Sequence, residues 1–467
     1  MELDTDCRRL VVQPMPIEEL GEQLQGFLAR IRAETQVPGI AAAISVGGRR
    51  AYAAAGTRLV DEASPLAIDD RFHLGCATKL LLAIVALELA CGGKLDLNAP
   101  IDDYLAELGG TVHGRTVRVA NLLSHTSGYR GTNIMEHQTR DLTWPAFIDH
   151  LRGAPQLFTP GSVFSYEHTE SVLLGTIIER VSGKPSLELV REMILERLGI
   201  SHGLLGSDSA DARSAGQHDL DGSSGRFKRL HRVGHLPDFW LPAFSNFTLS
   251  LLDLVAIMES TIGFFSPISA ATLNLLQQPV VRLPPAAGGP LRELLPVAFG
   301  LGAAQLRDGF HGNSGLTHGQ CLGLRFNSQT GVSVAVGLNS AVPYLRDFVL
   351  AAICRDLTGS STAQERQRFE LDFVALEGRY LGPGRGTVVA RVDKERLVCE
   401  IGRDGSMQKV TVELVLDDDE QLVLRSAAPQ LSMAFFREPS SGDLGLMIGL
   451  SAYKRIAAPA VREPLHR

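Results

Sequence analysis

The sequence has few cysteines, and they form no recognisable pattern. Six are present among 467 residues, without the spacing of a metal site or a disulfide framework. They are Cys7, Cys76, Cys91, Cys321, Cys354 and Cys399. Free thiols in a reducing compartment are the simplest account. We therefore expect a cytoplasmic protein with no metal and no cofactor.

Several catalytic signatures are also absent. The chain has no G-x-S-x-G segment, no Walker A loop, no H-E-x-x-H helix and no C-x-x-C pair. Strong charge is missing too, since the net charge is −7 and no basic cluster stands out. We expect no nucleic-acid partner. The sequence leaves the oligomeric state open.

No apolar run is long enough to span a bilayer, which takes roughly 20 residues. The longest one follows Lys79 and ends at Gly92-Gly93. The acidic start, Met1-Glu2-Leu3-Asp4, has no apolar stretch of the kind found in a signal peptide. We expect no membrane partner.

The chain is 45% hydrophobic, enough for a large core and for two or three domains. Apolar periodicity and turn signals predict the following elements. Helices are expected at residues 17–35, 119–123, 170–181, 186–197, 250–262 and 343–357, and strands at 40–46, 50–55, 297–306, 322–326 and 332–338. Terminal strands around a helical middle indicate an α+β domain whose sheet collects both ends of the chain.

The pattern changes beyond the polar segment 358–362. Short strands separated by turn signals are expected at residues 387–392, 396–401, 409–416, 421–425, 433–437 and 446–448. This spacing predicts a small antiparallel barrel or sandwich. We therefore expect one domain at residues 1–360 and a second at 370–460.

The segment Cys76-Ala77-Thr78-Lys79 opens the apolar helix and brings two reactive groups together. Residues three apart share a helix face, so the thiol and the amine can meet. The positive end of the helix dipole and a nearby ammonium both stabilise a thiolate, and a thiolate is an acyl-accepting nucleophile. A buried core cysteine beside a solvated lysine is the other interpretation, and this stretch alone leaves both open.

Together with other motifs, this segment resembles the serine β-lactamase and penicillin-binding-protein superfamily. The similarity is greatest to its class C-like branch of esterases, D-aminopeptidases and transesterases. The family motifs S-x-x-K, Y-x-N and basic-Thr/Ser-Gly correspond to Cys76-Ala77-Thr78-Lys79, Tyr166-Glu167-His168 and Asn313-Ser314-Gly315. Framing segments at residues 122–128, 158–161 and 299–302 match as well.

The resemblance covers residues 17–357, and the segment after it resembles the lipocalin-like module appended to some members. It implies an α+β fold in which an antiparallel sheet is flanked by helices and joined to a helical region. A small antiparallel β-barrel follows this domain.

The resemblance also implies roles for individual residues. Cys76, Lys79 and Tyr166 would converge in a cleft as the catalytic groups, with Tyr166 moving a proton to the leaving group. The backbone N–H groups of Cys76 and Leu316 would form the oxyanion hole. Asn313, Ser314 and Gly315 would line the substrate site. His168 is either a partner of Cys76 or a hydrogen-bonding replacement for the family's Asn. His125, Ser127 and Cys91 are interpreted as structural.

Three motif positions depart from the family, since Cys76 replaces Ser, His168 replaces Asn and Asn313 replaces Lys or His. Asn313 lacks the charge that holds a substrate carboxylate, which argues against β-lactam or D-Ala-D-Ala substrates. We predict acyl transfer through a Cys76 thioester, from a thioester or ester donor to an amine, an alcohol or water. The expected substrate is a small acyl compound, free or linked to a carrier protein. A plain esterase or amidase is the alternative enzyme, and a pseudoenzyme that binds a ligand without turnover is the alternative of another class.

Overall fold

The computed structural model describes most of the chain. The described residues are 16–130, 142–201, 204–205, 214–221, 224–230, 238–243, 245–264, 266–284, 294–317, 319–358, 376–382, 386–393, 396–403, 410–416, 422–426, 433–448 and 451–457. They form two compact units. Unit 1 comprises residues 1–92, 183–277 and 303–362, and unit 2 comprises residues 93–182, 278–302 and 363–467.

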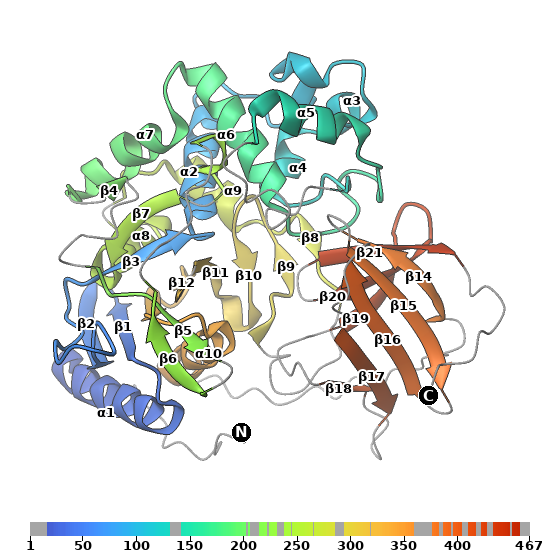
Figure 1. Ribbon diagram of the computed structural model, residues 1–467. Helices are drawn as coiled ribbons and strands as arrows, with labels where there is room; N and C mark the ends of the chain where they lie inside the picture. Colours follow the sequence, from blue (N-terminus) through green and yellow to red (C-terminus); the bar gives the residue numbers. More distant parts are fainter. Residues whose placement is uncertain are drawn as a thin grey trace. The chain divides into compact units, whose positions relative to one another are not determined.

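The core of unit 1 is an antiparallel sheet in the order β2-β1-β13-β12-β11-β10 (Figure 1). Its strands are β1 Gly39–Val46, β2 Arg49–Gly56, β10 Ala304–Gln305, β11 His311–Thr317, β12 Gln320–Asn327 and β13 Val332–Leu338. β1 pairs with β13, so strands from both ends of the unit's sequence meet at the centre of the sheet. The predicted α+β arrangement is therefore present.

Two helices, α1 Ile17–Thr35 and α10 Pro343–Thr358, cover one face of this sheet (Figure 1). The spacing of Leu20, Leu24 and Leu28 gives α1 a continuous apolar stripe, and these side chains pack with alternate residues of β1 and β13. The intervening residues of these strands point to the opposite face of the sheet, away from this core. Gly337 is one of them, and it lies against the Phe72 ring. Helix α8, Leu251–Thr261, also packs on β1, β12 and β13.

The rest of unit 1 surrounds helix α2, Thr78–Cys91, which is buried almost along its whole length. Strand β3, Arg71–Gly75, leads into it and pairs with β7, Ser245–Ser250, which also pairs with β4, Leu204–Leu205. The helices α7 Ser186–Val190 and α9 Ala270–Gln277 pack on α2. One π-helical turn, Arg191–Leu195, and one 3₁₀ turn, Glu196–Leu198, continue α7.

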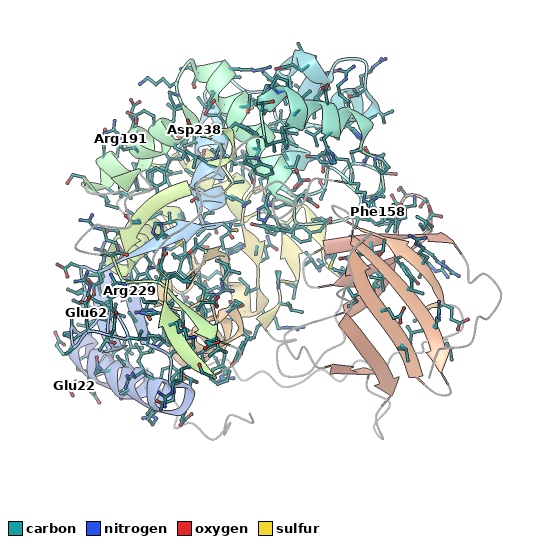
Figure 2. All side chains as sticks on the ribbon, viewed as in Figure 1. Glu22, Glu62, Phe158, Arg191, Arg229 and Asp238 are labelled. Atoms are coloured by element: carbon teal, nitrogen blue, oxygen red, sulfur yellow. The ribbon has the colours of Figure 1, made fainter. Side chains whose placement is uncertain are left out.

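A hairpin of β5 His218–Asp221 and β6 Arg226–Arg229 completes unit 1. Its last residue, Arg229, forms an ion pair with Glu62 at 3.3 Å, and both residues are labelled in Figure 2. A short 3₁₀ turn, Asp238–Trp240, carries a Trp240 side chain with no exposed surface.

The first part of unit 2 is helical. Its elements are the 3₁₀ turns Ile101–Asp103 and Ala106–Leu108, the helices α3 Val112–Thr116, α4 Val119–Leu123, α5 Trp144–Gly153 and α6 His168–Ser182, and the hairpin of β8 Val281–Arg282 with β9 Ala298–Phe299. Helix α4 packs on α6. The ion pair between Arg180 and Glu107 ties α6 to the second 3₁₀ turn at 2.5 Å.

The second part of unit 2 is a curled antiparallel sheet in the order β18-β17-β16-β15-β14-β21-β20-β19 (Figure 1). Its strands are β14 Gly378–Leu381, β15 Gly386–Asp393, β16 Arg396–Arg403, β17 Val410–Leu416, β18 Leu422–Ser426, β19 Met433–Arg437, β20 Leu444–Ile448 and β21 Ser451–Ala457. In the described residues the two edge strands, β18 and β19, do not pair with each other. The predicted fold class is confirmed. The predicted boundary between residues 360 and 370 lies outside the described residues.

Two segments expected to be loops contain regular structure. The stretch from residue 206 to 226 is rich in Gly, Ser and Asp, a composition that predicts a loop, yet its second half enters the β5–β6 hairpin. Its strands are charged and largely exposed, so they lack the alternation that indicates a strand. The polar stretch 130–145 predicts a rim loop that includes Trp144, but Trp144 begins α5, where Thr143 caps the helix and Pro145 occupies its first turn.

None of the helices in the described part of the chain is both long enough and apolar enough to cross a membrane.

Candidate active site

Cys76 lies in the short connection between β3 and α2, and its side chain is half-buried. The sequence predicted that Cys76 stands at the start of the helix. That expectation is wrong in its detail, because α2 begins at Thr78. The N–H groups of Lys79 and Leu80 donate to the carbonyls of Cys76 and Ala77, at 3.1 and 3.2 Å. Cys76 therefore stands just before the helix N-terminus.

Lys79 is on the first turn of α2, and its side chain is 5% exposed. Its Nζ atom donates a hydrogen bond to the carbonyl oxygen of Ala243 at 2.6 Å. A buried amine is costly unless it has such partners. This bond fixes the Lys79 side chain in the apolar surroundings of α2.

The third motif is on β11, which the sequence patterns did not predict. Asn313, Ser314 and Gly315 occupy consecutive positions there, and the Asn313 side-chain oxygen accepts the N–H of Ser314 at 2.7 Å. Gly315 touches the preceding segment so closely that a Cβ atom would come within 2.0 Å of the Leu74 carbonyl oxygen. Only glycine fits at this crossing.

The same crossing brings the Leu316 backbone beside Gly75, whose φ angle of 50° is in the left-handed region. A Cβ atom on Gly75 would lie 2.8 Å from the Leu316 carbonyl oxygen. The main chain before Cys76 thus runs against the main chain of residues 315–316. Two backbone N–H groups on adjacent segments are what an oxyanion hole requires.

Behind β11 lies a buried charge cluster that the sequence did not predict. The Arg346 side chain is 7% exposed, donates to the Gly315 carbonyl at 3.2 Å, and pairs with Asp347 at 2.7 Å. Arg325, 9% exposed, donates to the Asn313 carbonyl at 3.2 Å and lies 3.7 Å from the same Asp347 carboxylate. Two guanidinium groups therefore share one carboxylate directly behind the third motif.

Three thiols lie within electrostatic reach of this cluster. Burial raises the pKa of Cys321 to about 11 and that of Cys354 to about 12, so both stay protonated at neutral pH. Burial disfavours the charged form of Arg346, but the negative charge of Asp347 and its hydrogen bond to Arg346 outweigh this effect. The pKa of Arg346 is therefore raised, with smaller contributions from Cys321 and Cys76. Of the three, only Cys76 is not fully buried.

Unit 2 carries the second motif. Tyr166 is half-buried just before α6, and His168 is the first residue of that helix. The Tyr166 ring packs against two imidazoles, with centroids 4.6 Å from His125 and 5.3 Å from His168. The structure thus brings Tyr166 and His168 together, as their spacing implies.

A buried polar cluster supports Tyr166 from below. The His125 Nδ1 atom hydrogen-bonds to the Glu170 carboxylate, which also accepts the hydroxyl of Ser127 at 2.5 Å and its N–H at 3.2 Å. Glu170 has no exposed surface. The structural roles expected for His125 and Ser127 fit this arrangement. Glu170 was not singled out, because its partners come from a turn 43 and 45 residues earlier.

The remaining candidates have ordinary packing roles. The His311 Nε2–H donates to the Gln277 carbonyl, 3.2 Å away, and the ring stacks on Phe326. Burial lowers the pKa of His311, which keeps it neutral. Cys91 is exposed near the far end of α2. Among the described residues, no group of His, Cys, Asp and Glu side chains has the geometry to hold a metal ion.

The comparisons with known proteins identify the family of this chain. The family model described as "Beta-lactamase" matches residues 24–353. Penicillin-binding protein 4 of Amycolatopsis lactamdurans is 29% identical over 172 residues, which is 36% of this chain and 45% of that protein. Esterase EstB of Burkholderia gladioli is 28% identical over 198 residues, covering 39% of this chain and 50% of that protein. The chain spans about half the length of the curated relatives that it matches.

Solved structures match over most of the chain. SurE superposes with a TM-score of 0.72 and 23% identity, covering 94% of this chain and 100% of SurE. The octameric penicillin-binding protein homologue from Pyrococcus abyssi gives a TM-score of 0.62 at 21% identity, covering 93% of this chain and 99% of that one. At these identities the likeness concerns the fold alone.

Proposed function

We propose that this chain, which belongs to the β-lactamase family, transfers acyl groups through a thioester formed on Cys76. The observation that carries the proposal is the setting of Cys76. It stands between β3 and α2, where the family has its nucleophile, and the main chain of β11 runs alongside. A half-buried thiol where two backbone segments cross suits attack on a carbonyl carbon, and we assign the N–H groups of Cys76 and Leu316 to the oxyanion hole.

The reaction has two balanced steps. The Cys76 thiolate adds to the carbonyl carbon of an ester or thioester, and the oxyanion accepts hydrogen bonds from the N–H groups of Cys76 and Leu316. Collapse of this adduct expels the alcohol or thiol, which takes up the proton delivered by Tyr166. An amine, an alcohol or water then attacks the Cys76 thioester. It loses its proton to Tyr166, and the thiolate is released.

Arg346 strengthens this proposal because it supplies positive charge where the third motif has none. Asn313 replaces the basic residue of the family motif, but the Arg346 guanidinium lies directly behind Gly315. Asp347 balances one of the two buried arginines and leaves one unbalanced. A neighbouring opposite charge stabilises an ionised group. We propose that this positive charge stabilises the Cys76 thiolate and the developing oxyanion.

Arg346→Met should slow acylation of Cys76 by about tenfold at pH 7, since the variant removes a buried positive charge that stabilises the developing oxyanion. Stopped-flow acylation and the rate of alkylation by iodoacetamide measure this. Arg346→Lys should recover part of the rate. Arg355→Gln on the same helix is the control, because Arg355 is 46% exposed and pairs with Asp356. Equal rates in Arg346→Met and Arg355→Gln would remove Arg346 from the mechanism.

His168→Asn should separate the two roles left open for this residue. If His168 takes part in proton transfer, restoring the family's residue should reduce acylation by about 10²-fold or more. If the variant acylates as fast as the parent, His168 only replaces the hydrogen bonds of Asn. Circular dichroism and the melting temperature check that the fold is intact.

The substrates we propose are neutral acyl esters and thioesters of small molecules or carrier proteins. Asn313 offers no charge at the surface of the motif to pair with a substrate carboxylate, and the buried guanidinium groups bond to backbone carbonyls and to Asp347. The name of the Burkholderia gladioli relative, an esterase, supports this substrate class. A panel of thioesters, oxygen esters and a chromogenic β-lactam tests it. We expect turnover of the first two, whereas turnover of the β-lactam alone would refute the proposal.

A further inference from the structure

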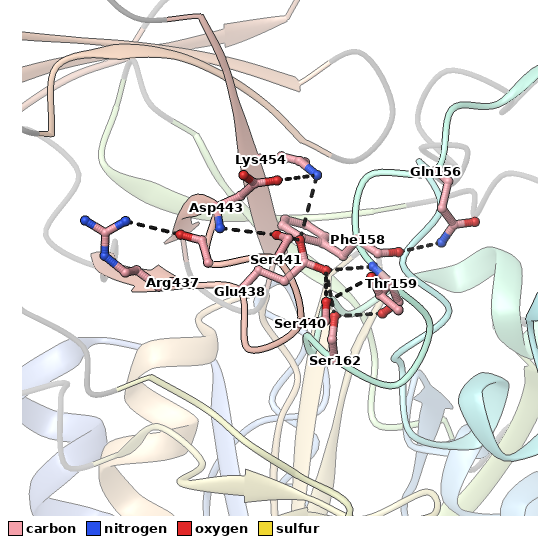
Figure 3. Close-up of polar contacts among 11 residues, drawn as sticks. Gln156, Phe158, Thr159, Ser162, Arg437, Glu438, Ser440, Ser441, Asp443 and Lys454 are labelled. Atoms are coloured by element: carbon pink, nitrogen blue, oxygen red, sulfur yellow. Dashed lines mark hydrogen bonds and ion pairs between the residues drawn. The ribbon is translucent and has the colours of Figure 1, made fainter.

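Glu438 is a buried carboxylate in the turn between β19 and β20. It is 2% exposed, and it accepts hydrogen bonds from a segment far away in the sequence (Figure 3). Its Oε1 atom accepts the Thr159 N–H at 2.8 Å and the Ser162 hydroxyl at 3.0 Å. The curled sheet is therefore joined to the helical part of unit 2 through this side chain.

The turn itself holds the carboxylate in place. Ser440 and Ser441 each donate a hydroxyl to Glu438 at 3.0 Å. Lys454 on β21 lies 3.7 Å from Glu438 and 3.0 Å from Asp443 (Figure 3). Contacts within the curled sheet therefore hold the Glu438 side chain in place. Its carboxylate is a preorganised acceptor for the donors of Thr159 and Ser162.

The segment that Glu438 binds leads directly to Tyr166. Phe158 and Val163 are buried, but the four residues between them are exposed or half-buried, so apolar packing does not fix this stretch. Phe158 is labelled in Figure 2, close to the curled sheet. On one side, Gly161 and Ser165 donate to the carbonyls of Thr126 and His125, at 2.7 and 2.8 Å.

On the other side, its partners in the described part of the chain come from the curled sheet. Glu438 binds Thr159 and Ser162, and the Ser165 hydroxyl accepts the Ala452 N–H from β21 at 3.1 Å. Hydrogen bonds to the turn at residues 124–128 on one side and to the C-terminal sheet on the other therefore hold the residues just before Tyr166 in place.

We propose that Glu438 is a positioning residue for Tyr166. By anchoring residues 159–162, the C-terminal sheet keeps the Tyr166 phenol at a fixed place on the His125 ring. This inference rests on the proton-transfer role given to Tyr166 in the proposed function. It assigns the C-terminal sheet a part in catalysis, although that sheet carries none of the three motifs. Small displacements of a catalytic group cost large factors in rate, which is why such an anchor matters.

The charge of Glu438 sets the pH range of the anchor. Burial opposes the charged form, but the hydrogen bonds from Thr159, Ser440, Ser162 and Ser441 outweigh it and lower the pKa of Glu438. A carboxyl group whose pKa is lower in the folded protein stabilises the folded state. This stabilisation is complete above the pKa of the unfolded state, and it is lost as the pH falls through the pKa of the folded state. Lys454 and Asp443 are the charged groups that face it. The anchor is therefore intact at neutral pH and weakens only in acid, below the ordinary pKa of a glutamate.

The test compares Glu438→Gln, Glu438→Ala and Asp443→Asn in the full chain. Glu438→Ala should lower kcat about tenfold while KM changes less than twofold, and it should speed amide hydrogen exchange in residues 159–166. Glu438→Gln retains one acceptor oxygen and should fall between Glu438→Ala and the parent. Asp443→Asn is the matched control, since the Asp443 carboxylate is exposed and pairs with the same lysine, whereas Glu438 is the side chain of this turn that binds Thr159 and Ser162. It should resemble the parent in both readouts.

Two results would overturn the proposal. One is unchanged hydrogen exchange in Glu438→Ala, and the other is faster exchange with unchanged kcat. If Glu438→Ala does not fold, Ser162→Ala removes the bond to Glu438 together with one to the Thr159 carbonyl, and it should still lower kcat two- to threefold. The hydrogen-exchange result does not depend on turnover. A parent enzyme that forms no Cys76 adduct would therefore defeat the proposed function, while the anchor itself would remain testable.

Discussion

Cys76→Ala is expected to abolish turnover and acyl-adduct formation together, with a loss on the order of 10⁴-fold or more in kcat. Removing a nucleophile takes away the covalent route entirely and leaves only binding and oxyanion stabilisation. Steady-state kinetics on the best ester or thioester of the panel measures this loss. Cys91→Ala is the matched control, because Cys91 is an exposed thiol near the far end of α2. Full activity in Cys76→Ala would show that the covalent mechanism is wrong.

Cys76→Ser sharpens this prediction. Serine is the family's nucleophile, but its hydroxyl must lose a proton to a base, whereas a thiol ionises near pH 8.5. The Lys79 amine is already engaged with the Ala243 carbonyl at 2.6 Å. The positive charge of Arg346 favours an anion without accepting a proton. We therefore expect the serine variant to fold normally and to lose most of the activity. Equal activity would mean that the site still supplies a serine-type base.

Glu170→Ala is expected to cause the largest loss of stability, about 3–5 kcal/mol in the free energy of unfolding. The carboxylate is fully buried, and it binds the His125 ring and both the N–H and hydroxyl of Ser127. Removing it leaves these donors buried without a partner, which costs more than the net value of each bond. His125 also has a φ angle of 52°, an unfavourable conformation for a residue with a side chain that the cluster must hold.

Urea denaturation of the full chain measures this effect. Glu179→Ala on the same helix is the control, since Glu179 is exposed and its replacement should change the unfolding free energy by no more than about 0.5 kcal/mol. Glu170→Gln keeps the shape and should fall between the two. A loss of less than about 1 kcal/mol in Glu170→Ala would show that the cluster does not support the turn before Tyr166.

Elements with a strong local signal could be predicted from the sequence. The apolar periodicity at Leu20, Leu24 and Leu28 predicts α1 with the bounds that the structure has. The turn Gln329-Thr330-Gly331 predicts the pairing of β12 with β13. In both cases the residues that decide the structure are close together in the chain, so periodicity and turn chemistry suffice.

Strand β11 could not be predicted in this way. Its sequence, His311 to Thr317, contains two glycines and no alternation of apolar and polar residues. It becomes a strand because β12 pairs with it and because Gly315 allows close contact with Leu74. Tertiary contacts therefore override a weak local propensity.

The motif residues of the site were predictable, but their supporting groups were not. Cys76, Lys79, Tyr166 and Asn313 stand in motifs of fixed order. Arg346 reaches the Gly315 carbonyl from 31 residues away. A Cβ at position 323 would lie 3.1 Å from its Cδ atom, so the missing side chain of Gly323 gives it room. Glu438 reaches Thr159 across 279 residues. No local sequence pattern identifies such partners. Each acts through a hydrogen bond to a backbone atom far away in the sequence, and only the folded structure buries the side chain there.

Mass spectrometry of the wild-type chain, after brief incubation with a thioester and an oxygen ester of the same acyl group, tests the central claim most directly. The account predicts one added acyl mass per chain, mapped by peptide sequencing to Cys76. The adduct should disappear on addition of an amine acceptor or of neutral hydroxylamine, which cleaves thioesters readily. An adduct on any other residue, or turnover of the ester in a chain that never carries the acyl mass, would contradict it.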